Sequence, residues 1–278
     1  MSRPGHEPGS HREQIHRRPA LGGVSYLEWP AASTAAAGYH VVAPDRPGYG
    51  QSPDSPWPAT QQCLVNYVGE FVDALELGPH VTGGLSLEGG LAIGHTLARP
   101  DTVTGAMLLG SYGLMPRLSD GLTSLPRQVL TWAMLRTGLL GAMTRSMAGQ
   151  RAALDWSMAT LVRDRTQRTP ELLGEVWATA RTGRGLEAFA QWQHDQVLPD
   201  RLATDYRNEL ARITAPVLIV HGGRDTGVPV QRARSAAAAM PDATLEVVAG
   251  DGHWVQRDQP DVVIAAMLGF LRRPSAAA

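Results

Sequence analysis

The chain has 278 residues, of which 43% are hydrophobic, and a formal net charge of −1 at pH 7. This length suits one large α/β domain or a core with an inserted cap. The near-neutral charge gives no electrostatic reason to expect nucleic acid or an anionic membrane as a partner. The single cysteine, Cys63, excludes an internal disulfide. We find neither a signal-peptide pattern nor the roughly 18 consecutive apolar residues that a membrane span needs, so we expect a cytoplasmic protein.

The N-terminal part of the chain begins with a polar segment. Residues 1–19 show no helical or strand periodicity and predict a disordered tail. The elements expected after it are a short Ala-rich helix at 30–37, a strand at Val41–Ala43, a turn-rich loop at Asp45–Ser52 and a helix within 60–77.

The middle and C-terminal parts alternate short apolar runs with helical patterns. We expect a strand leading into Ser86, a helix up to about Arg99, then strands at Val103–Leu109, 217–220 and 244–248 and a last helix at about 260–272. Such alternation predicts a mostly parallel central sheet with helices on both faces. Residues 112–208 carry no strand signal and predict an inserted all-helical cap, so the core would comprise 20–111 and 209–275.

Three polar side chains follow predicted strands of this sheet. Ser86 stands in a Gly-rich turn, Asp225 follows the strand at 217–220, and His253 follows the strand at 244–248. Because functional groups gather at the carboxyl ends of parallel strands, we expect all three at one edge of the sheet. A serine hydroxyl needs a base to take its proton, and the base needs an acid to fix its tautomer. The three residues therefore predict a nucleophile, a base and an orienting acid.

Taken together, these residues make the chain resemble the α/β-hydrolase superfamily over roughly residues 20 to 273. The resemblance rests on the Asp45–Ser52 loop, the turn at Ser86, and the loops that carry Asp225 and His253. It implies that Ser86 is the nucleophile, His253 the general base and Asp225 the acid. It also implies that the backbone N–H of Leu87 and, from the loop Leu21–Ser25, that of Gly23 form the oxyanion hole.

Three features depart from the family pattern, one of which is the pair Gly83 and Gly84 in the strand before Ser86, which weakens that strand. Gln14–Ala20 occupies the place of an apolar central strand, and the two strands that usually precede it are missing, so the N-terminal strands look absent or degraded. We interpret this as a wrong start site or an upstream frame change. Glu88 stands two residues after Ser86, where a small residue is usual, and could crowd the turn or oppose an oxyanion.

The resemblance implies a cofactor-free serine hydrolase with a small-molecule substrate. We expect it to cleave a small to medium, largely apolar carboxylic ester, or a related acyl or C–C bond, through an acyl-enzyme. The alternative is a non-catalytic or impaired relative that binds its ligand without cleaving it. The sequence lacks a cysteine or histidine cluster that would predict a metal, contains no lysine for a phosphate loop, and leaves open a homodimer.

Overall fold

The computed structural model describes residues 28–273. Their centre is a four-stranded parallel sheet in the order β1 (His80–Leu85), β2 (Val103–Leu109), β3 (Val217–Gly222) and β4 (Ala243–Val248). Each strand ends within about two residues of the run that the sequence predicts. The mostly parallel sheet of the predicted α/β fold is therefore confirmed.

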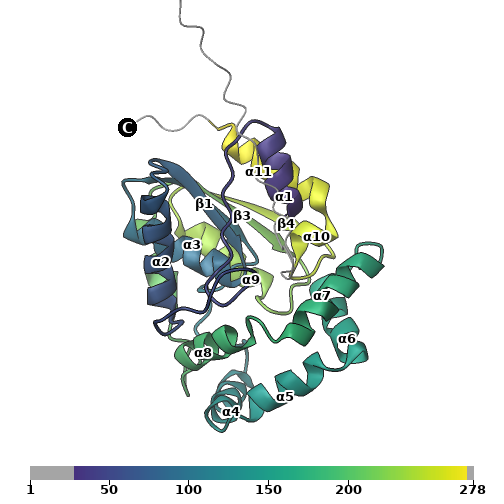
Figure 1. Ribbon diagram of the computed structural model, residues 1–278. Coiled ribbons are helices and arrows are strands. Elements are labelled where there is room, and N and C mark those ends of the chain that lie inside the picture. The colour runs from purple at the N-terminus through teal and green to yellow at the C-terminus, as the bar shows by residue number, and fades with distance from the viewer. Residues whose placement is uncertain (1–27, 274–278) are drawn as a thin grey trace, which may run out of the picture.

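Helices cover both faces of this sheet (Figure 1). The helices of the core are α1 (Glu28–Ala36), α2 (Gln61–Ala74), α3 (Leu87–Ala98), α9 (Val230–Ala239), α10 (Val255–Asp258) and α11 (Pro260–Leu271). Side chains of α3 and α9 form a buried cluster with one face of β2 and β3. Helix α11 packs on the opposite face of these strands. Helix α1 lies beside α11, on the outside of that layer (Figure 1).

The alternation of side chains along each strand explains how one sheet contributes to two clusters. Leu108 and Ile219 face the cluster with α3 and α9, whereas Leu109 and Val220 face the cluster with α11. Successive side chains of a strand point to opposite faces, so a continuous apolar run is needed when both faces are buried. Burying one such side chain contributes about 1.5–3 kcal/mol to folding, so both clusters stabilise the sheet.

The segment 112–208 is helical, as the sequence predicts. It contains α4 (Ser124–Arg136), α5 (Leu139–Ala148), α6 (Arg151–Leu161), α7 (Pro170–Thr182) and α8 (Leu186–Gln196), and an isolated bridge between Val197 and Leu202. These helices lie together along one side of the molecule (Figure 1). Two short 3-10 turns, Tyr206–Asn208 and Leu210–Arg212, lead back to β3.

The strand expected at Val41–Ala43 is wrong. These residues have no regular secondary structure, and Val41 and Val42 are 37% and 39% exposed. A strand is stable only when its N–H and C=O groups pair with a neighbour, and within residues 28–273 no strand lies beyond the edge strand β1. This result agrees with the expectation of missing or degraded N-terminal strands. The predicted tail and the Gln14–Ala20 segment lie outside the described residues.

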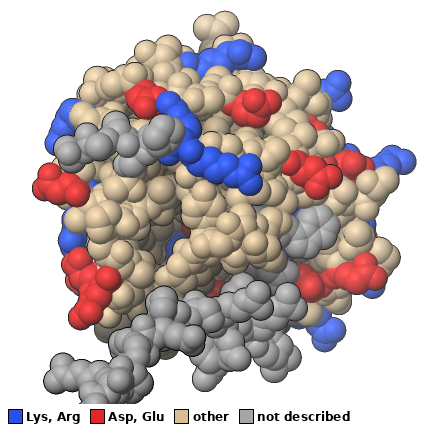
Figure 2. Space-filling model, turned by 90° about the horizontal axis from the view of Figure 1, so that it is seen from above, with Lys and Arg blue, Asp and Glu red and all other residues tan. Residues whose placement is uncertain are grey.

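The surface of the described chain is mixed in charge. Acidic and basic side chains are scattered among uncharged ones on the face that Figure 2 shows. In the part of the chain that the structure describes, no helix combines the length and apolarity that crossing a membrane requires.

Candidate active site

Ser86 lies in a sharp turn between β1 and α3. Its backbone has φ 55° and ψ −115°, a conformation that costs a non-glycine residue of the order of 1–3 kcal/mol. Three backbone hydrogen bonds hold the turn: Ser86 N–H donates to Leu109 O over 2.8 Å, and Ser86 O accepts from Gly90 and Tyr112. The serine is therefore fixed at the carboxyl end of β1, where its side chain projects from a strained and well-anchored turn.

The glycines around Ser86 are required by close contacts. A Cβ on Gly84 would lie 2.5 Å from backbone and side-chain atoms of Glu88, and one on Gly89 would overlap the hydroxyl of Ser111. Such distances are far inside van der Waals contact, so a larger residue at either position would displace the turn. The Gly-rich sequence around Ser86 thus has a steric cause.

Asp225 and His253 form a buried pair. The two residues lie in the loops after β3 and β4, and His253 Nδ1 is 2.8 Å from Asp225 Oδ2. The other oxygen of Asp225 accepts the N–H groups of Gly227 and Val228 over 2.7 and 2.9 Å. With Nδ1–H donating to the carboxylate, His253 Nε2 is free to act as a proton acceptor.

The charge of Asp225 is stabilised by these contacts. Burial by itself would raise the pKa of Asp225, but the hydrogen bond and charge of His253, followed by the Val228 N–H, hold it below its ordinary value. The acid therefore stays ionised next to the imidazole, as an orienting group must.

His221 supports the loop that carries Asp225. Its ring is fully buried, and its Nε2 lies 2.8 Å from Val228 O and 3.4 Å from Asp225 Oδ2. Burial lowers the pKa of His221 below its ordinary value. The side chain, which lies near the end of β3, therefore shapes the loop that follows this strand.

Gly110, directly after β2, lies between the Ser86 turn and the Asp225–His253 pair. Its Cβ position is 3.3 Å from both Asp225 Oδ2 and His253 Nδ1. The preceding residue, Leu109, is the acceptor of the Ser86 N–H. Ser86, Asp225 and His253 consequently share the carboxyl edge of the sheet, as the sequence predicts for residues that follow parallel strands.

The two predicted oxyanion donors have different outcomes. Leu87 is the first residue of α3, so its N–H belongs to the helix end whose amides lack intrahelical acceptors and favour negative charge. Gly23 and its loop Leu21–Ser25 lie outside the described residues. The Leu87 N–H therefore lies next to Ser86 in the chain, and the oxyanion-hole roles of Leu87 and Gly23 stay predictions.

Glu88 is paired with a cation that the sequence-based interpretation missed. Arg46 Nε lies 2.8 Å from Glu88 Oε1, and the Arg46 guanidinium stacks over the ring of Tyr49 at 4.1 Å. Arg46 belongs to the turn-rich loop whose sequence resembles the family. The sequence offered no signal for this pair, because the two residues lie far apart in the chain and the start of α3 already favours the charge of Glu88.

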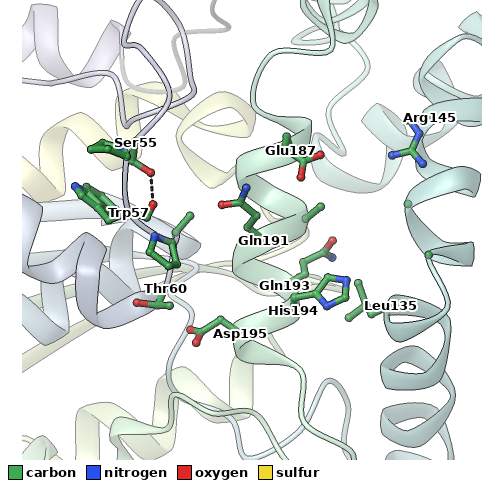
Figure 3. A pocket seen from close by; sticks show the side chains of 16 residues that line it. Ser55, Trp57, Thr60, Leu135, Arg145, Glu187, Gln191, Gln193, His194 and Asp195 are labelled. Carbon is green, nitrogen blue, oxygen red and sulfur yellow. Dashed lines mark hydrogen bonds between the residues drawn. The ribbon is translucent and has the colours of Figure 1, made fainter.

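A cavity of about 790 Å³ lies away from these residues. Figure 3 shows α8 in its middle, contributing Gln191, His194 and Asp195, with Trp57 on one side and Arg145 on the other. Ser86, Asp225 and His253 do not line it. The cavity is thus an outer groove beside α8. Within residues 28–273, no cluster of His, Cys, Asp or Glu is suited to bind a metal.

The sequence of the chain is similar to those of known hydrolases. Residues 19–260 match the family model of the alpha/beta hydrolase fold. An uncharacterised protein of Mycobacterium tuberculosis is 30% identical over 227 residues, which are 80% of this chain and 64% of the relative. The chain thus spans less than two thirds of that relative. The 2-hydroxy-6-oxo-6-phenylhexa-2,4-dienoate hydrolase of Burkholderia cepacia is 28% identical over 256 residues, 91% of this chain and 84% of the relative.

Solved structures show the same fold. An esterase from Thermogutta terrifontis superposes with a TM-score of 0.69 at 20% identity, covering 92% of this chain and 88% of that one. The enol-lactonase from Burkholderia xenovorans LB400 gives 0.68 at 20% identity, covering 90% and 87%. With a family model that matches most of its length and a parallel sheet that carries Ser86, Asp225 and His253 at one edge, this chain belongs to the α/β-hydrolase fold family.

Proposed function

We propose that the protein is a serine hydrolase that cleaves a small to medium, largely apolar carboxylic ester. The observation that carries this proposal is the buried Asp225–His253 hydrogen bond at the sheet edge where Ser86 occupies a strained turn. Apolar side chains surround that edge: Trp254 is buried with Met158 and Leu85 in one cluster. An apolar acyl or alkyl group would be desolvated favourably there.

The proposed reaction passes through an acyl-enzyme. His253 Nε2 takes the proton of Ser86 Oγ as this oxygen bonds to the ester carbonyl carbon, and the Leu87 N–H donates to the resulting oxyanion. The C–O bond to the alcohol then breaks, and His253 returns the proton to the leaving oxygen. Water, deprotonated by His253, attacks the acyl carbon, and Ser86 leaves with the proton, which releases the carboxylic acid.

A second candidate activity is hydrolysis of a C–C bond next to a carbonyl. It is favoured by the relative from Burkholderia cepacia, whose name describes a 2-hydroxy-6-oxo-dienoate hydrolase and which matches 91% of this chain. The same nucleophile, base and acid would serve, with a carbon rather than an oxygen as the leaving atom. Parallel assays with p-nitrophenyl esters of different chain length and a 2-hydroxy-6-oxo-dienoate separate the two activities.

The proposal as a whole is tested by a fluorophosphonate probe, which reacts covalently with activated serines. We expect one label on the wild-type protein, located on Ser86 by mass spectrometry, and none on Ser86→Ala. Ser111, a buried serine whose hydroxyl has no hydrogen-bond partner, serves as an internal control because it should stay unlabelled. Folded wild-type protein that takes up no label would support the non-catalytic alternative and overturn the proposal.

A further inference from the structure

Asp258 is a buried carboxylate with two hydrogen-bonded partners in different segments. It ends the short helix α10 and is 1% exposed. Its Oδ2 accepts the N–H of Gly252 over 2.7 Å, and its Oδ1 accepts the N–H of Asp164 over 2.9 Å. Asp164 lies between α6 and α7, so this one side chain joins the loop of His253 to the helical segment 112–208.

The backbone on both sides of His253 is held in this way. Gly252 N–H donates to Asp258, and Trp254 N–H donates to Leu161 O, at the end of α6, over 2.9 Å. A Cβ on Gly252 would lie 2.6 Å from that same Leu161 oxygen. The backbone is therefore fixed at the residues before and after His253, while the Nδ1 atom of the ring contacts the carboxylate of Asp225.

A buried carboxylate at this position is energetically unfavourable unless its charge is compensated. Burying an ionised carboxyl costs several kcal/mol unless it accepts good hydrogen bonds. Two more acidic side chains lie close by: burial, followed by the charges of Asp258 and Asp164, raises the pKa of Asp251 to about 6. A neutral residue would avoid both costs, but only an ionised carboxylate accepts two N–H groups through two oxygens without offering a hydrogen that would oppose them.

We propose that Asp258 is a positioning residue of the hydrolase. It holds Gly252, and with it His253, in the place where Nδ1 contacts Asp225. It also couples the position of the α6–α7 link to that of His253. This inference rests on the proposed function, because it assigns Asp258 a role through His253. Asp258 itself touches neither the nucleophile nor the substrate.

The test compares Asp258→Asn with Asp261→Asn in the full chain. Asn has the shape of Asp, but its NH₂ group would meet one of the two N–H donors. Asp261 is an exposed carboxylate three residues later, at the start of α11, and is the matched control. For p-nitrophenyl butyrate we expect kcat to fall about 100-fold in Asp258→Asn, the effect of a misplacement of roughly 1 Å, with KM little changed. Asp261→Asn should retain the wild-type kcat.

Two further readouts distinguish positioning from a general loss of structure. The first is the ¹H NMR signal of His253 Nδ1–H, assigned by its loss in His253→Gln; we expect Asp258→Asn to shift or broaden it and Asp261→Asn to leave it. The second is the His253→Ala background, in which Asp258→Asn should lower the residual rate no further, because residues acting through one group are not additive.

Each outcome decides the matter. An unchanged His253 signal together with a wild-type kcat overturns the positioning role and leaves the proposed hydrolase intact. A further loss of rate in the His253→Ala background also overturns it, since Asp258 would then act elsewhere. If wild-type protein neither takes up the fluorophosphonate nor cleaves the ester, the proposed function fails, while the NMR signal still reports whether Asp258 holds His253.

Discussion

At the level of single residues, the charge next to the Ser86 turn depends on two side chains. Glu88 lies two residues after Ser86, and its carboxylate pairs with Arg46, whose side chain is 16% exposed. An unpaired carboxylate at this point would oppose a developing oxyanion, whereas a pair is close to neutral. The sequence-based concern about Glu88 is thus changed by Arg46, although its effect on turnover stays a prediction.

Substitution of Arg46 should therefore be more harmful than substitution of Glu88. We expect Arg46→Gln to lower kcat for a short-chain ester, because the charge of Glu88 is left uncompensated near the Leu87 N–H. Glu88→Gln removes that charge, so no uncompensated carboxylate remains near the Leu87 N–H, and kcat should stay within a factor of about three. Steady-state assays of both variants check the order. A larger loss in Glu88→Gln than in Arg46→Gln would contradict it.

At the level of elements, the crossing of α2 and α3 depends on one glycine. A Cβ on Gly94 of α3 would lie 2.6 Å from Tyr206 Oη and 2.7 Å from a methyl carbon of Val65 in α2. A glycine inside a helix costs about 1 kcal/mol relative to alanine. Here the close packing of α2 against α3, which begins directly after Ser86, offsets this cost, because only a residue without a Cβ leaves room for Val65.

Alanine at two helical glycines should therefore have opposite effects. Gly94→Ala should lower the melting temperature despite its better helix propensity, because Val65 and Tyr206 must move. Gly269→Ala, in α11 where a Cβ would meet nothing within 4 Å, should raise stability by up to about 1 kcal/mol. Thermal unfolding followed by circular dichroism measures both. Stabilisation by Gly94→Ala would show that the contact between the helices relaxes without cost.

At the level of the whole molecule, the acid stability depends on the buried histidine His95 and its partly exposed neighbour His80. His95 in α3 is 1% exposed, its Nε2 lies 3.0 Å from His80 Nε2, and its Nδ1 has no hydrogen-bond partner. Burial, followed by the charges of His80 and Arg99, lowers the pKa of His95 from 6.5 to about 4, although Asp73 opposes this shift. The folded state therefore resists a proton that the unfolded chain accepts.

The sign of the resulting pH dependence follows from linkage. Because the pKa of His95 is lowered in the folded state, its contribution is fully present above pH 6.5 and is lost as the pH falls to about 4. We expect the free energy of unfolding to decrease over this range in wild-type protein and to decrease less in His95→Gln. Urea unfolding at several pH values between 7 and 4 measures the slopes. Parallel curves for the two proteins would contradict the assignment.

Much of the fold could be predicted because the signals are local. The runs Val103–Leu109 and Val217–Gly222 are apolar enough for strands buried on both faces, and Pro and Gly mark their ends. The strand at Val41–Ala43 failed because its stability depends on a partner strand and not on its own composition. The division into a core and an inserted cap stays a prediction, although the helices at 112–208 agree with it.

The sequence by itself determined the parallel sheet and the order of Ser86, Asp225 and His253, because strand periodicity and turn residues act over a few neighbouring positions. Their catalytic roles stay a prediction, as does the donor at Gly23. Only the tertiary structure decided that Asp225 bonds to His253, that Arg46 compensates Glu88, and that Asp258 holds the loop of His253. These contacts join residues from different segments, and their distances depend on how the whole chain packs.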